Sequence, residues 1–182
     1  MEQTLVSLSS DHRNYSKLLA VLKNDIDNLE HSVNPDFIRL YDIMNYMTNY
    51  PDVSHHPVEE IIFKALLAKS PDSADLVNAL VEEHKELARL GAALKEKLNH
   101  VISGSIVSKD AIIEAANNYY QYLTNHINSE EGNIFPIIEN TFSKDEWLQI
   151  NNQIDDTEDP LFGDVVQEQF TDLYKRISLS KD

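Results

Sequence analysis

Cysteine is absent from this chain of 182 residues. The absence excludes disulfides, thiolate zinc sites, iron–sulfur clusters and cysteine nucleophiles. Any metal ion must therefore be held by histidine, aspartate or glutamate side chains.

Basic residues are scarce: 15 Lys and Arg stand against 31 Asp and Glu, which gives a formal net charge of −16. Such a chain repels nucleic-acid phosphates and anionic lipid headgroups. Uninterrupted apolar runs of about 18 residues are also missing, and the start, MEQTLVSLSSDH, has no basic segment followed by an apolar one. We therefore expect a cytoplasmic protein whose partners include neither nucleic acid nor membrane.

Glycine is rare as well, with four residues in the chain. Together with long stretches of helical periodicity, this predicts an all-α protein. Short connections between four long helices favour an up-down-up-down four-helix bundle. Two prolines in YPDVSHHPVEE should kink or split the second of these helices. The predicted helices cover about 5–31, 36–69, 72–102 and 109–140.

A C-terminal helical extension, residues 143–182, is expected to pack on this bundle, residues 1–142. Ser143 and Glu146 form a capping-box pattern for a short helix that carries Trp147. The acidic stretch QIDDTEDP is typical of a linker, and DVVQEQFTDLYKRI predicts a last amphipathic helix folded back on the bundle.

The segment HINSEEGNIF places polar side chains on the apolar stripe of the fourth helix. His126 and Glu130 are four residues apart and therefore lie on one helix face. Leu123 and Ile134 lie on the same stripe. Both polar side chains should project toward the bundle axis.

The second helix repeats this spacing twice in HHPVEE, as His55 with Glu59 and as His56 with Glu60. One pair at most can face fully inward. Extending the stripe back from Ile62 favours His55 and Glu59, and the other pair stays an alternative.

The first and third helices each add one inward histidine, His12 and His84. A single histidine on an apolar face is usually a hydrogen-bonded core residue. Four of them with two carboxylates, buried without partners, would cost several kcal/mol per unpaired charge. A cation removes that cost, and two glutamates that can bridge favour a dinuclear centre of iron, manganese or zinc. The remaining glutamates and histidines near these positions are expected to be solvated or to cap helix ends: Glu82, Glu83, Glu86, Glu131, His31 and His100.

The order His12, HHPVEE, EEHKEL and HINSEEGNIFP resembles the hemerythrin-like family, also called the HHE cation-binding domain, over about residues 5–140. HHPxE is similar to a bacterial subgroup. The resemblance implies a non-haem di-iron site. Oxygen carriers of the family have a second histidine where this chain has Ala88, so the site resembles members with fewer histidines that handle oxygen, nitric oxide or iron. The implied ligands are His12, His55 or His56, His84 and His126, with Glu59 or Glu60 and Glu130 as bridges.

Three functions are compatible with this sequence. The first is a di-iron protein that binds or senses oxygen, nitric oxide or peroxide. The second is an enzyme that turns over peroxide or nitric oxide, or an iron donor, with electrons from a protein redox partner because the chain has no thiol. The third is a metal-stabilised scaffold whose C-terminal segment docks a partner through Trp147, Leu161, Phe162 and Phe170, although these side chains are more simply explained by packing on the bundle.

Overall fold

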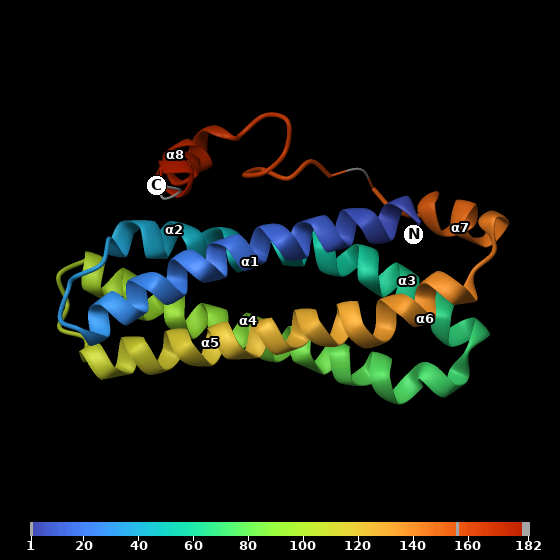
Figure 1. The fold of residues 1–182 in the computed structure, drawn as a ribbon, viewed down its shortest axis with the longest axis horizontal. Helices are drawn as coiled ribbons and strands as arrows, with labels where there is room; N and C mark the ends of the chain where they lie inside the picture. The colour runs from blue at the N-terminus through green and yellow to red at the C-terminus, as the bar shows by residue number, and fades with distance from the viewer. Residues whose placement is uncertain (1, 156, 180–182) are drawn as a thin grey trace.

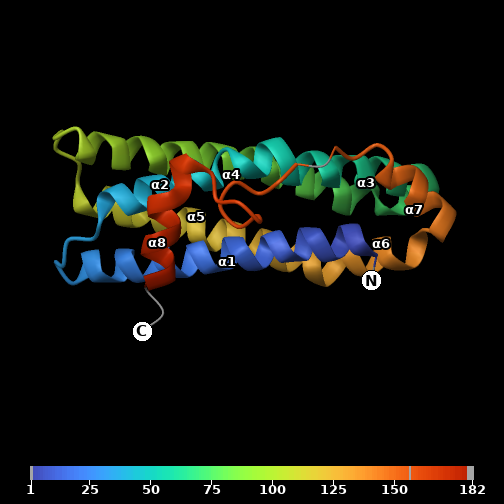
Figure 2. The ribbon, with the colours of Figure 1, turned by 90° about the horizontal axis from the view of Figure 1, so that it is seen from above.

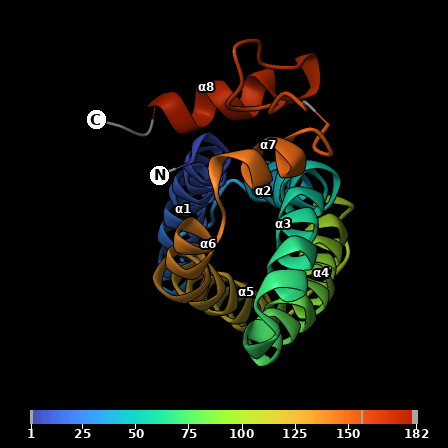
Figure 3. The same cartoon turned by 90° about the vertical axis from the view of Figure 1, so that its right-hand side faces the viewer.

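The protein is an all-α up-down-up-down bundle in a computed structural model that describes residues 2–155 and 157–179. Figure 1 shows the long helices side by side, and the end-on view of Figure 3 shows them arranged around one axis. We call each of the four passes of the chain along this axis a column. The second column consists of two helices in sequence, and so does the fourth. In chain order the columns are α1 (Gln3–Glu30); α2 (Phe37–Met47) with α3 (His56–Lys69); α4 (Ala74–Ile102); and α5 (Lys109–Ser129) with α6 (Phe135–Thr141).

The divided columns are joined through π-helical turns, η1 (Pro51–His55) and η3 (Glu130–Ile134). In each, the residue before a proline donates its backbone N–H to the carbonyl five residues earlier: His56 to Pro51, and Phe135 to Glu130. The following prolines have no N–H and would clash with a regular turn, so a wider turn relieves the conflict. The expected split of the second helix is confirmed, and the predicted fourth helix contains a wide turn that periodicity did not predict.

The apolar core consists of two clusters at opposite ends of the bundle. One contains Leu22 and Leu98, and the other contains Leu5 and Ile138. Gly91 permits close packing in the first cluster, since a Cβ there would lie 2.7 Å from Cγ2 of Thr48. The side chains that carry the predicted chemistry lie between the two clusters.

The C-terminal extension covers one side and one end of the bundle (Figure 2). The capping box at Ser143 is present and begins α7 (Lys144–Asn151). The last helix, α8 (Thr171–Leu179), packs against α2 and begins at Thr171 rather than at the predicted 164, after a 3₁₀ turn, Glu168–Phe170. Residue 156 of the predicted linker and residues 180–182 lie outside the described residues.

The four apolar side chains of the docking hypothesis do not form an exposed surface. Trp147 is 5% exposed, Leu161 is 0% exposed and Phe170 is 5% exposed. Phe162 is partly buried against the same cluster as Leu161. The hypothesis that these four side chains dock a partner is therefore wrong, because they pack on the bundle. Among the described residues, no helix has the length and apolar character needed to cross a membrane.

Candidate metal centre

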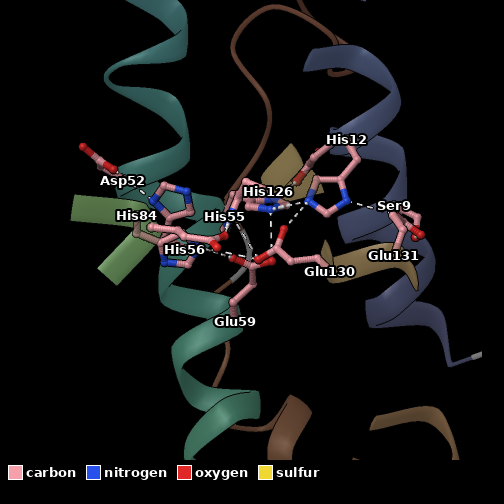
Figure 4. Close-up of polar contacts among 12 residues, drawn as sticks. Ser9, His12, Asp52, His55, His56, Glu59, His84, His126, Glu130 and Glu131 are labelled. Carbon is pink, nitrogen blue, oxygen red and sulfur yellow. Dashed lines mark hydrogen bonds and ion pairs between the residues drawn. The ribbon is translucent and has the colours of Figure 1, made fainter. Parts of the chain in front are cut away.

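Four histidines and two glutamates from all four columns converge between the apolar clusters (Figure 4). Each is at most 9% exposed. His12 comes from α1, His84 from α4 and His126 from α5. His55 ends η1 and Glu130 begins η3, so the two wide turns lie directly at the site. The sixth residue, Glu59, lies in α3.

Each glutamate lies between histidines from different helices. In Glu130, Oε2 lies 3.1 Å from His12 Nε2, while Oε1 lies 3.3 Å from His126 Nε2 and 3.5 Å from His84 Nε2. In Glu59, Oε1 lies 3.3 Å from His55 Nε2 and Oε2 lies 3.4 Å from His84 Nε2. Both oxygens of each carboxylate are therefore directed at nitrogen atoms, as in a bridging carboxylate.

These short contacts do not satisfy the buried carboxylates. Within residues 2–155 and 157–179, both oxygens of Glu59, both oxygens of Glu130 and Nε2 of His84 lack a hydrogen-bond partner. A buried charge without partners is strongly destabilising, and a metal ion is a common remedy. The free electron pairs of these atoms therefore fit a bound cation.

The ring nitrogens of His12 and His55 support the same conclusion. Their Nε2 atoms are 3.1 Å apart. Nδ1 of His12 lies 2.8 Å from Glu131 Oε1, and Nδ1 of His55 lies 3.0 Å from Asp11 Oδ2. A neutral imidazole that donates from Nδ1 presents an electron pair at Nε2. Two such pairs at this distance repel each other unless a proton or a metal ion lies between them.

His126 is oriented in the same way, since its Nδ1 lies 2.8 Å from Glu83 Oε2. Glu83 and Glu131 were expected to be solvated charges, and this expectation is corrected: both are partly buried and hold a histidine of another helix. Asp11 was not singled out from the sequence. Asp11, Glu83 and Glu131 each adjoin a residue of the site in the sequence. This adjacency is the sequence signal that could have identified them.

The separations also match the size of a coordination sphere. Nitrogen and oxygen ligands lie about 2.1 Å from zinc, and first-row ions of similar size are bound at similar distances. Two ligands at right angles are then about 3 Å apart. In the part of the chain that the structure describes, three overlapping groups have ligand atoms close enough to share an ion: His12, His55, Glu59 and Glu130; His56, Glu59 and His84; and His84, His126 and Glu130.

Comparison with known families identifies this arrangement. Residues 4–138 match the sequence model of the hemerythrin HHE cation binding domain. The chain belongs to this family. The matched range contains all the residues of the candidate site, and their buried histidines and glutamates could hold the cation that this family binds. No curated protein and no solved structure matches the chain.

Burial in the HHE domain shows which of the two pairs in HHPVEE faces inward. Glu60 is exposed, so the pair His56 and Glu60 does not face inward, whereas His55 and Glu59 both do. His56 nevertheless lies beside the centre: its ring stacks on His84 with centroids 4.0 Å apart, and its Nδ1 lies 3.0 Å from Asp52. As expected, His31 and His100 are exposed at helix ends.

Protonation of the HHE site is shifted by its own charges. Burial disfavours the charged form of His55, but Glu59 and Asp11 outweigh burial and raise its pKa to about 10. Burial is likewise outweighed at His84, where Glu130 and Glu59 raise the pKa to about 9. The pKa of Glu130 is lowered, because its histidine neighbours overcome the effect of burial. A metal ion must therefore displace protons from these histidines.

Proposed function

We propose that this HHE-domain protein holds a non-haem di-iron centre at which it binds or senses a small ligand such as oxygen, nitric oxide or peroxide. The observation that carries the proposal is the set of four buried oxygens of Glu59 and Glu130, which face histidines but have no hydrogen-bond partner among the described residues. Each carboxylate presents both oxygens to histidines of different helices. Two carboxylates in this arrangement favour a dinuclear centre inside a four-helix bundle.

The geometry supports a division of the candidate nitrogen ligands into two sets. His12 and His55, with facing Nε2 atoms, would hold one ion, and His84 and His126 would hold the other. Glu59 and Glu130 would bridge the ions. His56 is a further candidate nitrogen on the second side. Iron is proposed among the metals that suit nitrogen and oxygen ligands because of the family resemblance. When bound, iron supplies open positions and redox chemistry for small molecules.

The residues around the ligands have a defined physical role. Asp11, Glu83 and Glu131 accept hydrogen bonds from Nδ1, so each histidine keeps its proton there and presents Nε2 inward. The two apolar clusters lie on either side of the centre and limit the access of water. The protein thus provides oriented ligands in surroundings of low polarity.

The test is the iron content of a double variant, Glu59→Ala with Glu130→Ala. Every one of the three candidate ligand groups contains Glu59 or Glu130. We expect the variant to lose iron binding almost completely after reconstitution with ferrous iron. The matched control replaces Glu60 and Glu82, which are exposed glutamates on α3 and α4. Circular dichroism establishes that both variants remain helical.

Full iron content in a folded Glu59→Ala, Glu130→Ala variant contradicts the proposed centre. Loss of iron in the Glu60 and Glu82 control would show that the effect is not specific to the buried site. Repeated addition of peroxide or nitric oxide then separates the two functional classes: a stable adduct supports binding or sensing, and sustained consumption over many equivalents supports an enzyme.

A further inference from the structure

A small cavity adjoins the metal centre on the side of α2 and α4. Its wall includes the buried side chains of His12, Tyr15 and His126. The volume is about 30 Å³. One water molecule needs roughly half of that space, so the cavity accommodates a ligand of about one or two heavy atoms.

The cavity reaches the surface at a defined rim. Asp52 and Ala88 belong to its wall, and both are exposed. A surface groove that runs past Ala92 shares Thr48, Asp52 and Ala88 with the cavity. The chain therefore has a route from solvent to the centre, and this route passes the position at which the oxygen carriers have a histidine.

One residue of the wall carries an unsatisfied polar group. Tyr15 is 2% exposed, and its buried hydroxyl has no hydrogen-bond partner among the described residues. Its ring lies edge-on to His55, with centroids 5.3 Å apart. Leaving a buried hydroxyl unpaired is destabilising, which favours an additional partner for it.

Two neighbouring hydroxyl groups, those of Tyr46 and Thr48, are already engaged. Tyr46, whose ring centroid is 6.3 Å from that of Tyr15, donates its hydroxyl to Asp159 at 2.8 Å. Thr48, on the cavity wall, donates to the carbonyl of Met44. Much of the remaining wall is apolar, including Leu87. Tyr15 thus brings a free donor to a small pocket that is otherwise lined by apolar side chains and by histidines of the centre.

We propose that this cavity is the ligand site of the centre, that it is entered between Asp52 and Ala88, and that Tyr15 donates a hydrogen bond to the bound ligand. This inference rests on the proposed di-iron function. The ligand class is a small anion or diatomic molecule whose acceptor atom lies within reach of the hydroxyl. Ligands with strong acceptor atoms gain most from this contact.

The test compares two probes on iron-loaded wild-type protein and on Tyr15→Phe. Fluoride, on the oxidised protein, is a single atom and a strong acceptor; nitric oxide, on the reduced protein, is a weaker acceptor. We expect Tyr15→Phe to keep its iron, to bind fluoride about tenfold more weakly or worse, and to bind nitric oxide almost unchanged. Tyr46→Phe is the matched control, because it removes a nearby buried hydroxyl that is committed elsewhere.

Unchanged fluoride affinity in Tyr15→Phe overturns the proposal. Equal weakening of both probes also overturns it, because it indicates a packing role, and loss of iron would assign Tyr15 to the stability of the centre. Wild-type protein that binds iron but not fluoride contradicts the ligand site alone, whereas wild-type protein that takes up no iron contradicts the proposed function itself.

A second variant tests the entrance. Ala88→Phe adds a large side chain at an exposed position on the rim, where the fold should tolerate it. We expect slower association of both probes with unchanged iron content. Ala92→Phe lies one turn farther along α4 and lines the outer groove but not the cavity, so it serves as the control. Equal association rates in Ala88→Phe and wild type would exclude this entrance.

Discussion

The two HxxxE segments of the protein, His55 to Glu59 and His126 to Glu130, have the same residue spacing but use it differently. In both, a carboxylate from another helix holds the histidine: Asp11 in the first and Glu83 in the second. Both also adjoin a π-helical turn. The first turn ends at the histidine, and the second begins at the glutamate.

The two glutamates also differ in the histidines that they contact. Glu59 forms ion-pair contacts with His55 and His84, whereas Glu130 forms them with His12, His84 and His126. Consecutive residues in a regular helix point about 100° apart. At the wide turn, Glu130 and its neighbour Glu131 both reach His12, one at Nε2 and the other at Nδ1. The second segment thus makes the greater contribution to assembling the centre.

The largest expected effect separates the two glutamates. Glu59→Ala leaves the group of His84, His126 and Glu130 intact. We expect it to retain about one iron ion per chain. Glu130→Ala breaks contacts with three histidines and should retain less. Metal analysis after reconstitution measures both, with Glu60→Ala as the control, and the reverse order would contradict the comparison.

A second prediction concerns pH in the metal-free protein. The raised pKa of His55, about 10 against an ordinary 6.5, adds stability that is complete below 6.5 and lost as pH rises toward 10. The lowered pKa of Glu130 adds stability that is complete above 4.5 and lost as pH falls. Thermal unfolding should therefore show maximum stability of the metal-free protein between these values.

Iron loading should remove most of the alkaline loss, because metal ions replace the protons on the histidines. Thermal scans of both forms at about pH 6 and about pH 9 provide the measurement. A metal-free protein that becomes more stable on going from the lower to the higher pH would show that the assigned charge interactions of His55 and Glu130 do not control its stability.

Smaller effects are expected from the carboxylates that orient the rings. Asp11→Asn and Glu83→Gln each disturb the hydrogen bond at one Nδ1. Loss of such a partner typically lowers metal affinity by about 10-fold to 100-fold without abolishing binding. Competition with a chelator measures this change. Affinities equal to that of wild type would mean that packing alone orients the histidines.

The smallest expected effect comes from replacing His56, the residue that follows the first histidine. The corresponding residue of the second segment, Ile127, cannot bind a metal ion. His56→Ala removes a partly buried ring that stacks on His84. We expect iron affinity to fall by only a few-fold, well under the loss for an orienting carboxylate. A loss of one whole iron ion would instead make His56 an indispensable ligand of the second ion.

Much of the fold could be predicted because periodicity and proline positions act locally. The stripe that contains Leu123 and Ile134 placed His126 and Glu130 on the axis, and the prolines of the second column indicated its split. The wide turn at Glu130 was missed, although Pro136 gives the same local signal as the prolines of the second column. The proline alone does not show that both Glu130 and Glu131 reach His12.

The orienting carboxylates were missed because they serve neighbouring helices. Asp11 adjoins His12 but holds His55, and Glu83 adjoins His84 but holds His126. A side chain next to one that faces the bundle axis points toward the adjacent helix. When each helix is considered alone, Asp11 and Glu83 therefore resemble solvent-exposed charges. The arrangement of the columns is needed to identify their partners.

Metal analysis of the wild-type protein tests the central claim most directly. The protein should be expressed with iron available and purified without a histidine tag, and its metals counted by mass spectrometry. We expect about two iron ions per chain, held with Glu59 and Glu130 as the bridging carboxylates. A folded protein that contains no metal and cannot be reconstituted with ferrous iron would contradict this expectation, because the buried histidines and glutamates would then be satisfied without a metal ion.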